Sequence, residues 1–206
     1  DTISWDSQTS IANINLNPGE HSFFGEITSI SDTDFENKNN ALGVGDGILG
    51  IAYGSLIENA IGGKGPDVIV GNSVANVLYG GAGANILDTL TGGDGADIFK
   101  INALTDGSSA FQENVDVITD FKVGVDKVEV IGSSLDKIEW AKSSKDEKDT
   151  VIKVKGDDRE LFLLDNVISS DLSSSDFSFT ESKTPELSLA FNDTTKLVTI
   201  EGLDTD

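Results

Sequence analysis

Residues 62–100 read GGKGPDVIV-GNSVANVLY-GGAGANILD-TLT-GGDGADIFK, and this stretch decides the fold. Blocks of nine residues begin at Gly62, Gly71, Gly80 and, after three further residues, Gly92. The same register runs backwards through YGSLIENAI (53–61) and VGDGILGIA (44–52), so the core repeats span 44–100. A fixed period that carries an apolar residue at its eighth position argues against a disordered acidic segment.

Each position of the block has a physical reason. The apolar eighth residue points inward from a short strand while its two neighbours point outward, which assigns Ile69, Leu78, Leu87 and Phe99 to the core. Glycines permit a tight turn and let backbone carbonyls converge on one point. The sixth position adds a side-chain oxygen, from Asp67, Asn76, Asn85 and Asp97.

These oxygen-rich loops predict calcium sites, because Ca²⁺ takes six to eight oxygen ligands and one loop supplies too few. Two blocks make one turn of a solenoid, so every second loop stacks on the same side and shares ions with its neighbour. Gly62–Asp67 then lies against Gly80–Asn85, and Tyr53–Glu58 against Gly71–Asn76. Gly92 begins three positions later than two strict blocks after Gly71, which predicts a bulge near Asp88–Thr91.

A glycine-rich solenoid that binds nothing is the alternative interpretation. It is disfavoured because the stacked carboxylates repel one another without a cation. The amides of Asn76 and Asn85 carry no charge, so their sites are expected to be weaker.

Composition narrows the possible partners. The chain has 206 residues, with 14 Lys and Arg against 36 Asp and Glu, a net charge of −22. Such a surplus argues against nucleic-acid binding and against docking on anionic lipid. There is no cysteine, hence no disulfide, and no stretch is apolar enough to insert in a membrane. Residues 1–120 hold only three of the basic residues but 17 acidic ones.

The flanking segments alternate apolar and polar residues and predict strands, not helices. Residues 1–40 are typical of antiparallel or edge strands. Further strands are expected at 127–131, 137–141, 149–155, 159–164 and 177–179. Residues 181–206 read as a linker followed by a hairpin, or as the start of a further module.

Three segments carry a family resemblance: INLNPG (14–19), LGIAYGSLIENAIGGKGPDVIVGN (49–72) and DVITDFKVGVDK (116–127). Through them, roughly residues 1–131 resemble the calcium-binding C-terminal domain of serralysin-type secreted metalloproteases, a branch of the RTX proteins. Residues 149–179 are similar to the β-sandwich tail of many RTX proteins. The expected fold is all-β, with a parallel β-roll at 1–131, an antiparallel β-sandwich cap at 132–180, and residues 181–206 beyond it.

By position, the resemblance implies calcium contacts for a defined set of residues. These are Asp1, Leu56 (carbonyl), Glu58, Gly63, Gly65, Asp67, Asn72, Val74 (carbonyl), Asn76, Gly80, Gly81, Gly83, Asn85, Gly92, Gly93, Gly95, Asp97, Asp106 and Asp116. Asp1-Thr2 resembles the end of a GGNDT calcium loop, so the chain is expected to begin inside a motif.

The resemblance also implies a function. The leading hypothesis is a non-catalytic module that folds on extracellular calcium, with several Ca²⁺ ions, and serves a secreted bacterial metalloprotease exported by a type I secretion apparatus. Its partners would be that apparatus and the parent's catalytic domain. Zinc is expected only in that domain, because this chain lacks HExxH and has one histidine, His21.

Two other hypotheses remain open from the sequence. One is a binding or structural module of a large RTX adhesin or a polysaccharide-modifying enzyme. The other is an enzyme within these residues, for which pairs such as Asp116/Asp120 or Asp157/Asp158 mimic a glycosidase site. Acidic pairs are expected in so acidic a chain, so we predict no catalytic residue here.

Overall fold

The computed structural model describes residues 1–6, 8–25, 47–82, 86–105, 115–156, 160–180, 188–192 and 197–201. Apart from two short 3₁₀ helices, η1 (Leu135–Lys137) and η2 (Ser174–Asp176), every regular element in these ranges is a strand. The all-β prediction is therefore confirmed. Within the same ranges, no helix has the length and apolar character needed to cross a bilayer.

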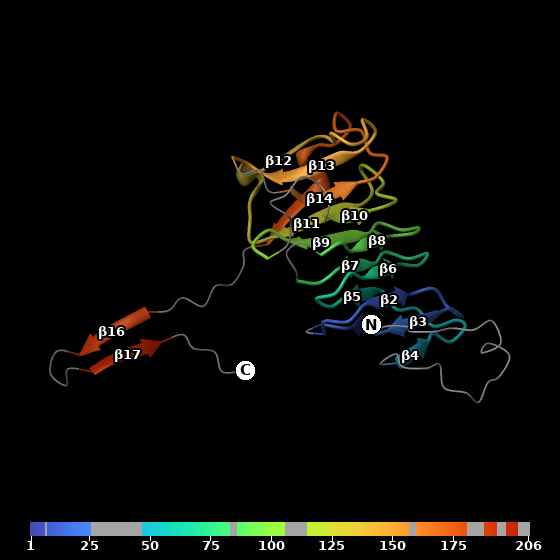
Figure 1. Cartoon of the computed structure of the whole chain (residues 1–206), viewed down its shortest axis with the longest axis horizontal. Helices are drawn as coiled ribbons and strands as arrows, with labels where there is room; N and C mark the ends of the chain where they lie inside the picture. Colours follow the sequence, from blue (N-terminus) through green and yellow to red (C-terminus); the bar gives the residue numbers. More distant parts are fainter. Residues whose placement is uncertain are drawn as a thin grey trace.

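Two sheets lie face to face along a common stack (Figure 1). The six-stranded sheet is parallel throughout and contains, in order, β1 (Thr2–Ser4), β5 (Asn59–Ile61), β7 (Val77–Tyr79), β9 (Ile98–Asn102), β11 (Lys127–Ile131) and β15 (Phe177–Thr180). The nine-stranded sheet runs β12 (Ile138–Lys142), β13 (Thr150–Val154), β14 (Glu160–Leu164), β10 (Asp116–Ile118), β8 (Thr89–Thr91), β6 (Val68–Val70), β2 (Ala12–Asn15), β3 (His21–Phe24) and β4 (Gly47–Gly50).

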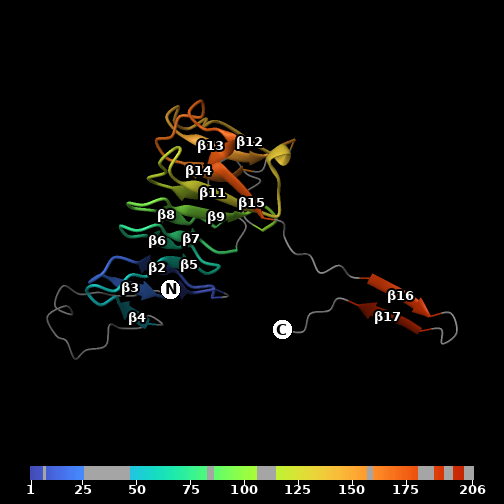
Figure 2. The same cartoon turned by 180° about the vertical axis from the view of Figure 1, so that it is seen from behind.

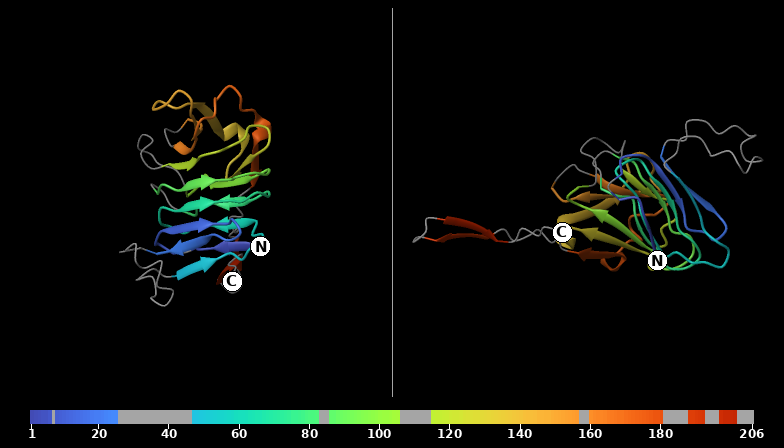
Figure 3. Two further views of the ribbon diagram at one scale, coloured as in Figure 1. Left: turned by 90° about the vertical axis from the view of Figure 1, so that its right-hand side faces the viewer. Right: turned by 90° about the horizontal axis from the view of Figure 1, so that it is seen from below.

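Successive strands from β4 to β11 alternate between the two sheets, as a period of nine with two blocks per turn requires. The view along the stack shows the sheets as two layers joined by loops on either side (Figure 3). From β5 to β11, each strand has a buried apolar residue that packs between the layers. The resulting core includes Ala60, Ile69, Leu78, Leu90, Phe99, Ile118 and Val128, all nearly inaccessible to water.

The register changes once along the repeats. Strands β5 and β7 pair Ala60 with Leu78, its equivalent two blocks of nine later in the chain. Strands β6 and β8 instead pair Ile69 with Leu90, which stands three positions beyond Leu87, the equivalent that strict blocks would give. The three extra residues therefore fall between Gly81 and Asp88. The predicted bulge at Asp88–Thr91 is wrong in position, because residues 89–91 form β8.

The same shift corrects the predicted core. The block register places Leu87 inside, but this side chain is 42% exposed, and Leu90 is buried in its place. Leu87 precedes β8, whereas Leu90 is its central residue. The block that begins at Gly80 is therefore twelve residues long. Its last four residues, Asp88-Thr-Leu-Thr91, match the ending of the block that closes with Asp67-Val-Ile-Val70.

The flanking strands extend the two sheets. β1 and β2 pair in parallel with β5 and β6, respectively. The prediction of antiparallel or edge strands for residues 1–40 is therefore only partly right: β1 is an edge strand, and β2, β3 and β4 pair with one another in antiparallel fashion. In the cap, the antiparallel strands β12–β13–β14 continue the nine-stranded sheet and β15 continues the six-stranded one (Figure 2). Trp140 stacks on Phe177 across the layers, with ring centroids 4.9 Å apart.

The strands beyond the cap agree with the sequence prediction. β16 (Ser188–Asn192) and β17 (Leu197–Glu201) form a separate antiparallel pair. Residues 26–46, which include most of the acidic stretch before the repeats, lie outside the described residues.

Candidate metal centre

The loops between the sheets gather on two edges of the stack. We call one edge the first loop edge; its described residues are 62–67, 80–82, 86–88, 103–105 and 115, with Asp116 at the start of β10, and they lie between strands of the six-stranded and the nine-stranded sheet. The second loop edge consists of loops 51–58, 71–76, 92–97 and 119–126, which lead from the nine-stranded to the six-stranded sheet. Parallel strands place equivalent loops one above another, so backbone and side-chain oxygens form columns along each edge.

The structure distributes the predicted ligands between these edges. Gly63, Gly65, Asp67, Gly80, Gly81 and Asp116 lie on the first loop edge, and Leu56, Glu58, Asn72, Val74, Asn76, Gly92, Gly93, Gly95 and Asp97 on the second. Asp1 joins the second edge through an ion pair between its ammonium group and Glu58, which lowers the pKa of that carboxyl. Gly83, Asn85 and Asp106 lie outside the described residues.

Glycine keeps the space between stacked loops clear. Gly81 has φ +120°, and a Cβ atom there would overlap the carbonyl oxygen of Gly63 in the loop below. On the second edge a Cβ on Gly93 would overlap the Asn72 carbonyl, and one on Gly95 would lie 2.8 Å from the Val74 carbonyl oxygen. Carbonyl oxygens of one loop therefore face the loop above without a side chain between them.

On each edge, an aspartate at or just before the start of a strand links its turn to the turn below. On the first edge, Asp88 Oδ1 accepts the backbone N–H of Asp67 at 2.8 Å, and Asp116 Oδ1 accepts that of Asp88 at 3.0 Å. On the second edge, Asp97 Oδ1 accepts from Asn76 at 2.8 Å, and Asp126 Oδ1 accepts from Asp97 at 3.0 Å. We call these two series the aspartate ladders. Asp67 therefore stacks on Asp88 and not, as predicted, on Asn85.

At the sixth position of a block, a side-chain oxygen can accept the backbone N–H of the second residue of the same block, which closes the loop. Asp67 Oδ2 accepts the N–H of Gly63 at 2.5 Å, and Asn76 Oδ1 accepts that of Asn72 at 2.8 Å. In the 92–97 loop this bond is missing, because Gly93 donates its N–H to Asp120 instead, at 2.8 Å.

Asp97 is consequently left with an uncommitted oxygen. Its side chain is buried, and Oδ2 has no hydrogen-bond partner among the residues that the structure describes. Leaving a buried carboxylate oxygen unpaired costs about 1–3 kcal/mol or more. Binding of a proton or a cation to this oxygen would remove that cost.

Asn72 and Asn76 are committed to neutral hydrogen bonds. Their side-chain amides donate to the carbonyls of Ile57 and Glu58, at 2.8 and 3.0 Å. Asn72 Oδ1 accepts the N–H of Val74 at 3.0 Å. The level between loops 51–58 and 71–76 is thus joined by amides, and its side-chain oxygens fit a cation less well than that of Asp97.

The predicted ligand set leaves out three acidic residues on the loop edges, Asp88, Asp120 and Asp126, and a fourth, Asp176, that contacts the second edge from η2. The strict block register puts Asp88 at the wrong position, although the DTLT ending indicates the correct one. Asp120 binds the N–H groups of Gly92 and Gly93, at 2.7 and 2.8 Å. The others are Asp126, in the ladder, and Asp176, whose carboxylate caps Gly124 and Ser173.

Burial raises the pKa of both Asp67 and Asp97 above the ordinary value of 3.8, and at Asp97 the neighbouring Asp126 and Asp120 add to the effect. The folded chain therefore binds these protons more tightly than the unfolded chain. Their contribution to stability is lost as the pH rises through the raised pKa values, and it returns as the pH falls through them.

In calcium-depleted protein we expect the β-sheet signal in circular dichroism to increase as the pH is lowered from 7 toward the raised pKa values of these two carboxyls. The double substitution Asp67→Asn/Asp97→Asn should remove most of this increase, because the variant has no buried carboxyl to protonate at these positions. A wild-type signal that falls steadily with acidification would contradict the assignment.

The donor set suits a hard cation bound mainly by backbone oxygens. No three His, Asp or Glu side chains converge as in an all-side-chain metal site, within the ranges described. Instead, carbonyls face the next loop and single carboxylates stand beside them, the mixture that calcium accepts. The lone histidine, His21, lies exposed on β3, so the described residues contain no zinc-protease constellation.

Comparison with known proteins agrees with this arrangement. A family model described as Peptidase M10 serralysin C terminal matches residues 31–159, more than half of the chain. The match extends past the predicted boundary at 131 into the cap strands. No curated protein matches the sequence. The chain belongs to the serralysin C-terminal family of M10 peptidases, an RTX-type, non-catalytic module of secreted metalloproteases.

Proposed function

We propose that this module binds several calcium ions between its stacked loops and folds when it meets extracellular calcium. The observation that carries the proposal is the buried Oδ2 of Asp97, which has no hydrogen-bond partner within the described chain. The residues that would hold an ion there are Asp97, through this oxygen, and Asn72 and Val74, through their carbonyls. Calcium would supply positive charge and a coordination shell that accepts neutral and charged oxygens together.

The charge distribution supports coupling between binding and folding. Residues 1–120 carry 17 acidic side chains against three basic ones, and several of the acidic ones are brought into columns by the ladders. Without a cation, the mutual repulsion and desolvation of these carboxylates oppose the entropy-demanding winding of the chain. Ion binding then contributes directly to folding free energy.

We infer the domain organisation and the biological role from membership of the family. We infer a parallel β-roll at 1–131, a cap at 132–180 and a further segment at 181–206. The parent would be a bacterial zinc metalloprotease secreted through a type I apparatus, and the module would assist its export and folding outside the cell. The family match favours this parent over an adhesin or a polysaccharide-modifying enzyme.

A calcium titration tests the proposal. Circular dichroism of the full chain should change from a largely unfolded spectrum in chelator to a β-sheet spectrum in millimolar calcium, and calorimetry should find more than one bound ion. Magnesium at the same concentration serves as the control, because it dehydrates reluctantly and prefers octahedral sites. Equal β-content in chelator and in calcium would overturn the proposal.

Asp97→Asn is predicted to have opposite effects with and without calcium. Removing a buried unpaired charge should increase the folded fraction in chelator, while loss of the ligand charge should weaken calcium binding at that site about tenfold or more. The matched control is Asp171→Asn, an exposed aspartate outside the loop edges. If both variants have the wild-type calcium affinity, Asp97 is not a ligand.

A further inference from the structure

Residues 121–129, FKVGVDKVE, occupy the place of one more repeat block. Gly124, Asp126 and Val128 stand at its fourth, sixth and eighth positions. Val128 is buried and pairs with Phe99, the eighth residue of the block below. Lys122 N–H donates to Asp126 Oδ2 at 2.7 Å, just as Gly63 N–H donates to Asp67 Oδ2.

Lys122 therefore holds the second position of this block. In the blocks below, that position is taken by Gly63, Asn72, Gly81 and Gly93, residues with no side chain or a short neutral one. The proposed function places metal ions between the stacked loops, with the Asn72 carbonyl as one of the ligands. Lysine instead introduces a long side chain with a positive charge.

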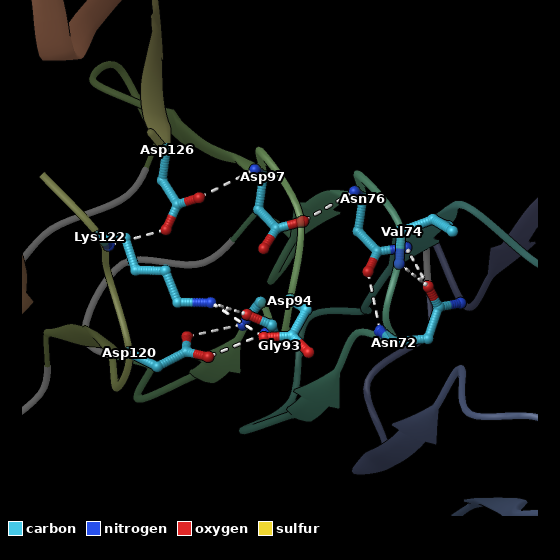
Figure 4. Close-up of polar contacts among 10 residues, drawn as sticks. Asn72, Val74, Asn76, Gly93, Asp94, Asp97, Asp120, Lys122 and Asp126 are labelled. Carbon is cyan, nitrogen blue, oxygen red and sulfur yellow. Dashed lines mark hydrogen bonds and ion pairs between the residues drawn. The ribbon is translucent and has the colours of Figure 1, made fainter. Parts of the chain in front are cut away.

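The Lys122 side chain turns back toward the 92–97 loop (Figure 4). Its Nζ donates to the carbonyl oxygen of Gly93 at 2.5 Å and lies 3.5 Å from Asp94 Oδ1. The Gly93 carbonyl is equivalent by position to that of Asn72, which faces Gly93 in the loop above and accepts the backbone N–H of Asp94 at 3.2 Å. The ammonium group thus contacts an oxygen of the type that the lower levels present to an ion.

Asp120 provides hydrogen-bond acceptors at the same level, where Lys122 provides a donor. Its carboxylate accepts the N–H groups of Gly92 and Gly93, while Lys122 donates to the Gly93 carbonyl. Both residues line a cleft of about 420 Å³ on the second loop edge, together with Asn72, Gly93 and Asp94. Side chains of the chain itself therefore satisfy both the donors and the acceptors that the 92–93 backbone presents upward.

We propose that Lys122 is a tethered cation that takes the place of a calcium ion between loops 92–97 and 119–126, so that this level binds no metal. The inference rests on the proposed function, since it concerns where the calcium sites of the stack end. On the second loop edge, calcium sites then stop below this level, and the 119–126 loop docks on the stack through Lys122 and Asp120.

The test compares calcium stoichiometry in three full-length proteins by calorimetry with CaCl₂: wild type, Lys122→Gln and Lys142→Gln. Lys142→Gln is the matched control, because it removes the same charge from an exposed ion pair with Glu147 in the cap. Lys122→Gln should bind one ion more than the wild type, since the amide leaves the Gly93 carbonyl accessible and adds an oxygen ligand. Lys142→Gln should bind the wild-type number.

Each other outcome overturns the inference. An unchanged number in Lys122→Gln means that the ammonium excludes no ion, and an equal gain in both variants means that only general charge matters. If Lys122→Gln fails to fold in calcium while Lys142→Gln folds, a metal cannot replace the ammonium, and Lys122→Arg then shows whether any cation serves. Failure of the proposed function is recognised separately, because the wild type would then bind no calcium.

Discussion

Gly81→Ala is expected to destabilise the calcium-loaded protein by about 3 kcal/mol or more, because overlap with a fixed backbone adds to an unfavourable dihedral angle. The new Cβ would overlap the Gly63 carbonyl oxygen, which belongs to a loop held by strands on both sides. Chemical denaturation in excess calcium measures the loss.

Gly54→Ala is the control for this prediction. Gly54 also has a positive φ, +79°, but nothing lies within 4 Å of its added Cβ. Its substitution should cost only the dihedral strain, about 1–2 kcal/mol. Similar losses in both variants would mean that the close approach of the loops is not what requires glycine at position 81.

Leu90→Ala is expected to cost about 2–5 kcal/mol, the range for truncating a fully buried leucine, whereas Leu87→Ala should cost well under about 1 kcal/mol. The two residues stand three positions apart in one twelve-residue block, and only Leu90 lies between the sheets. Denaturation of both variants under identical calcium concentrations measures the difference. A larger loss for Leu87→Ala would restore the strict nine-residue register.

The period of nine is sufficient to predict the alternation of strands between two sheets and the stacking of Glu58 on Asn76. It fails at the third block because ILD and TLT both offer an apolar residue at a plausible eighth position. What decides between them is the packing of Leu90 against neighbouring turns, together with the ladder bond from Asp67 to Asp88. Such contacts join residues of different blocks, and block-by-block alignment does not contain them.

The candidate site was predictable in its residue types but not in its hydrogen bonds. Asp97 and Asp67 occupy the same block position, but both oxygens of Asp67 accept backbone N–H groups, whereas Asp97 Oδ2 accepts none from the described residues because Asp120 takes the Gly93 N–H. Lys122 escapes a search for the motif since the 121–129 block has lost both opening glycines. Its Gly124-x-Asp126-x-Val128 ending is the available signal.

The aspartate ladders have a consequence for cooperativity. Each rung joins only adjacent turns, so the stack behaves as a one-dimensional chain of coupled units, in which stability is the sum of unit and nearest-neighbour terms. Asp88→Ala removes the side-chain bond to the backbone N–H of Asp67 in the turn below, whereas the backbone N–H of residue 88 still donates to Asp116 in the turn above, so the substitution cuts the coupling on one side only. Such a lesion should divide one unfolding transition into two, with the turns on either side of the lost bond melting independently.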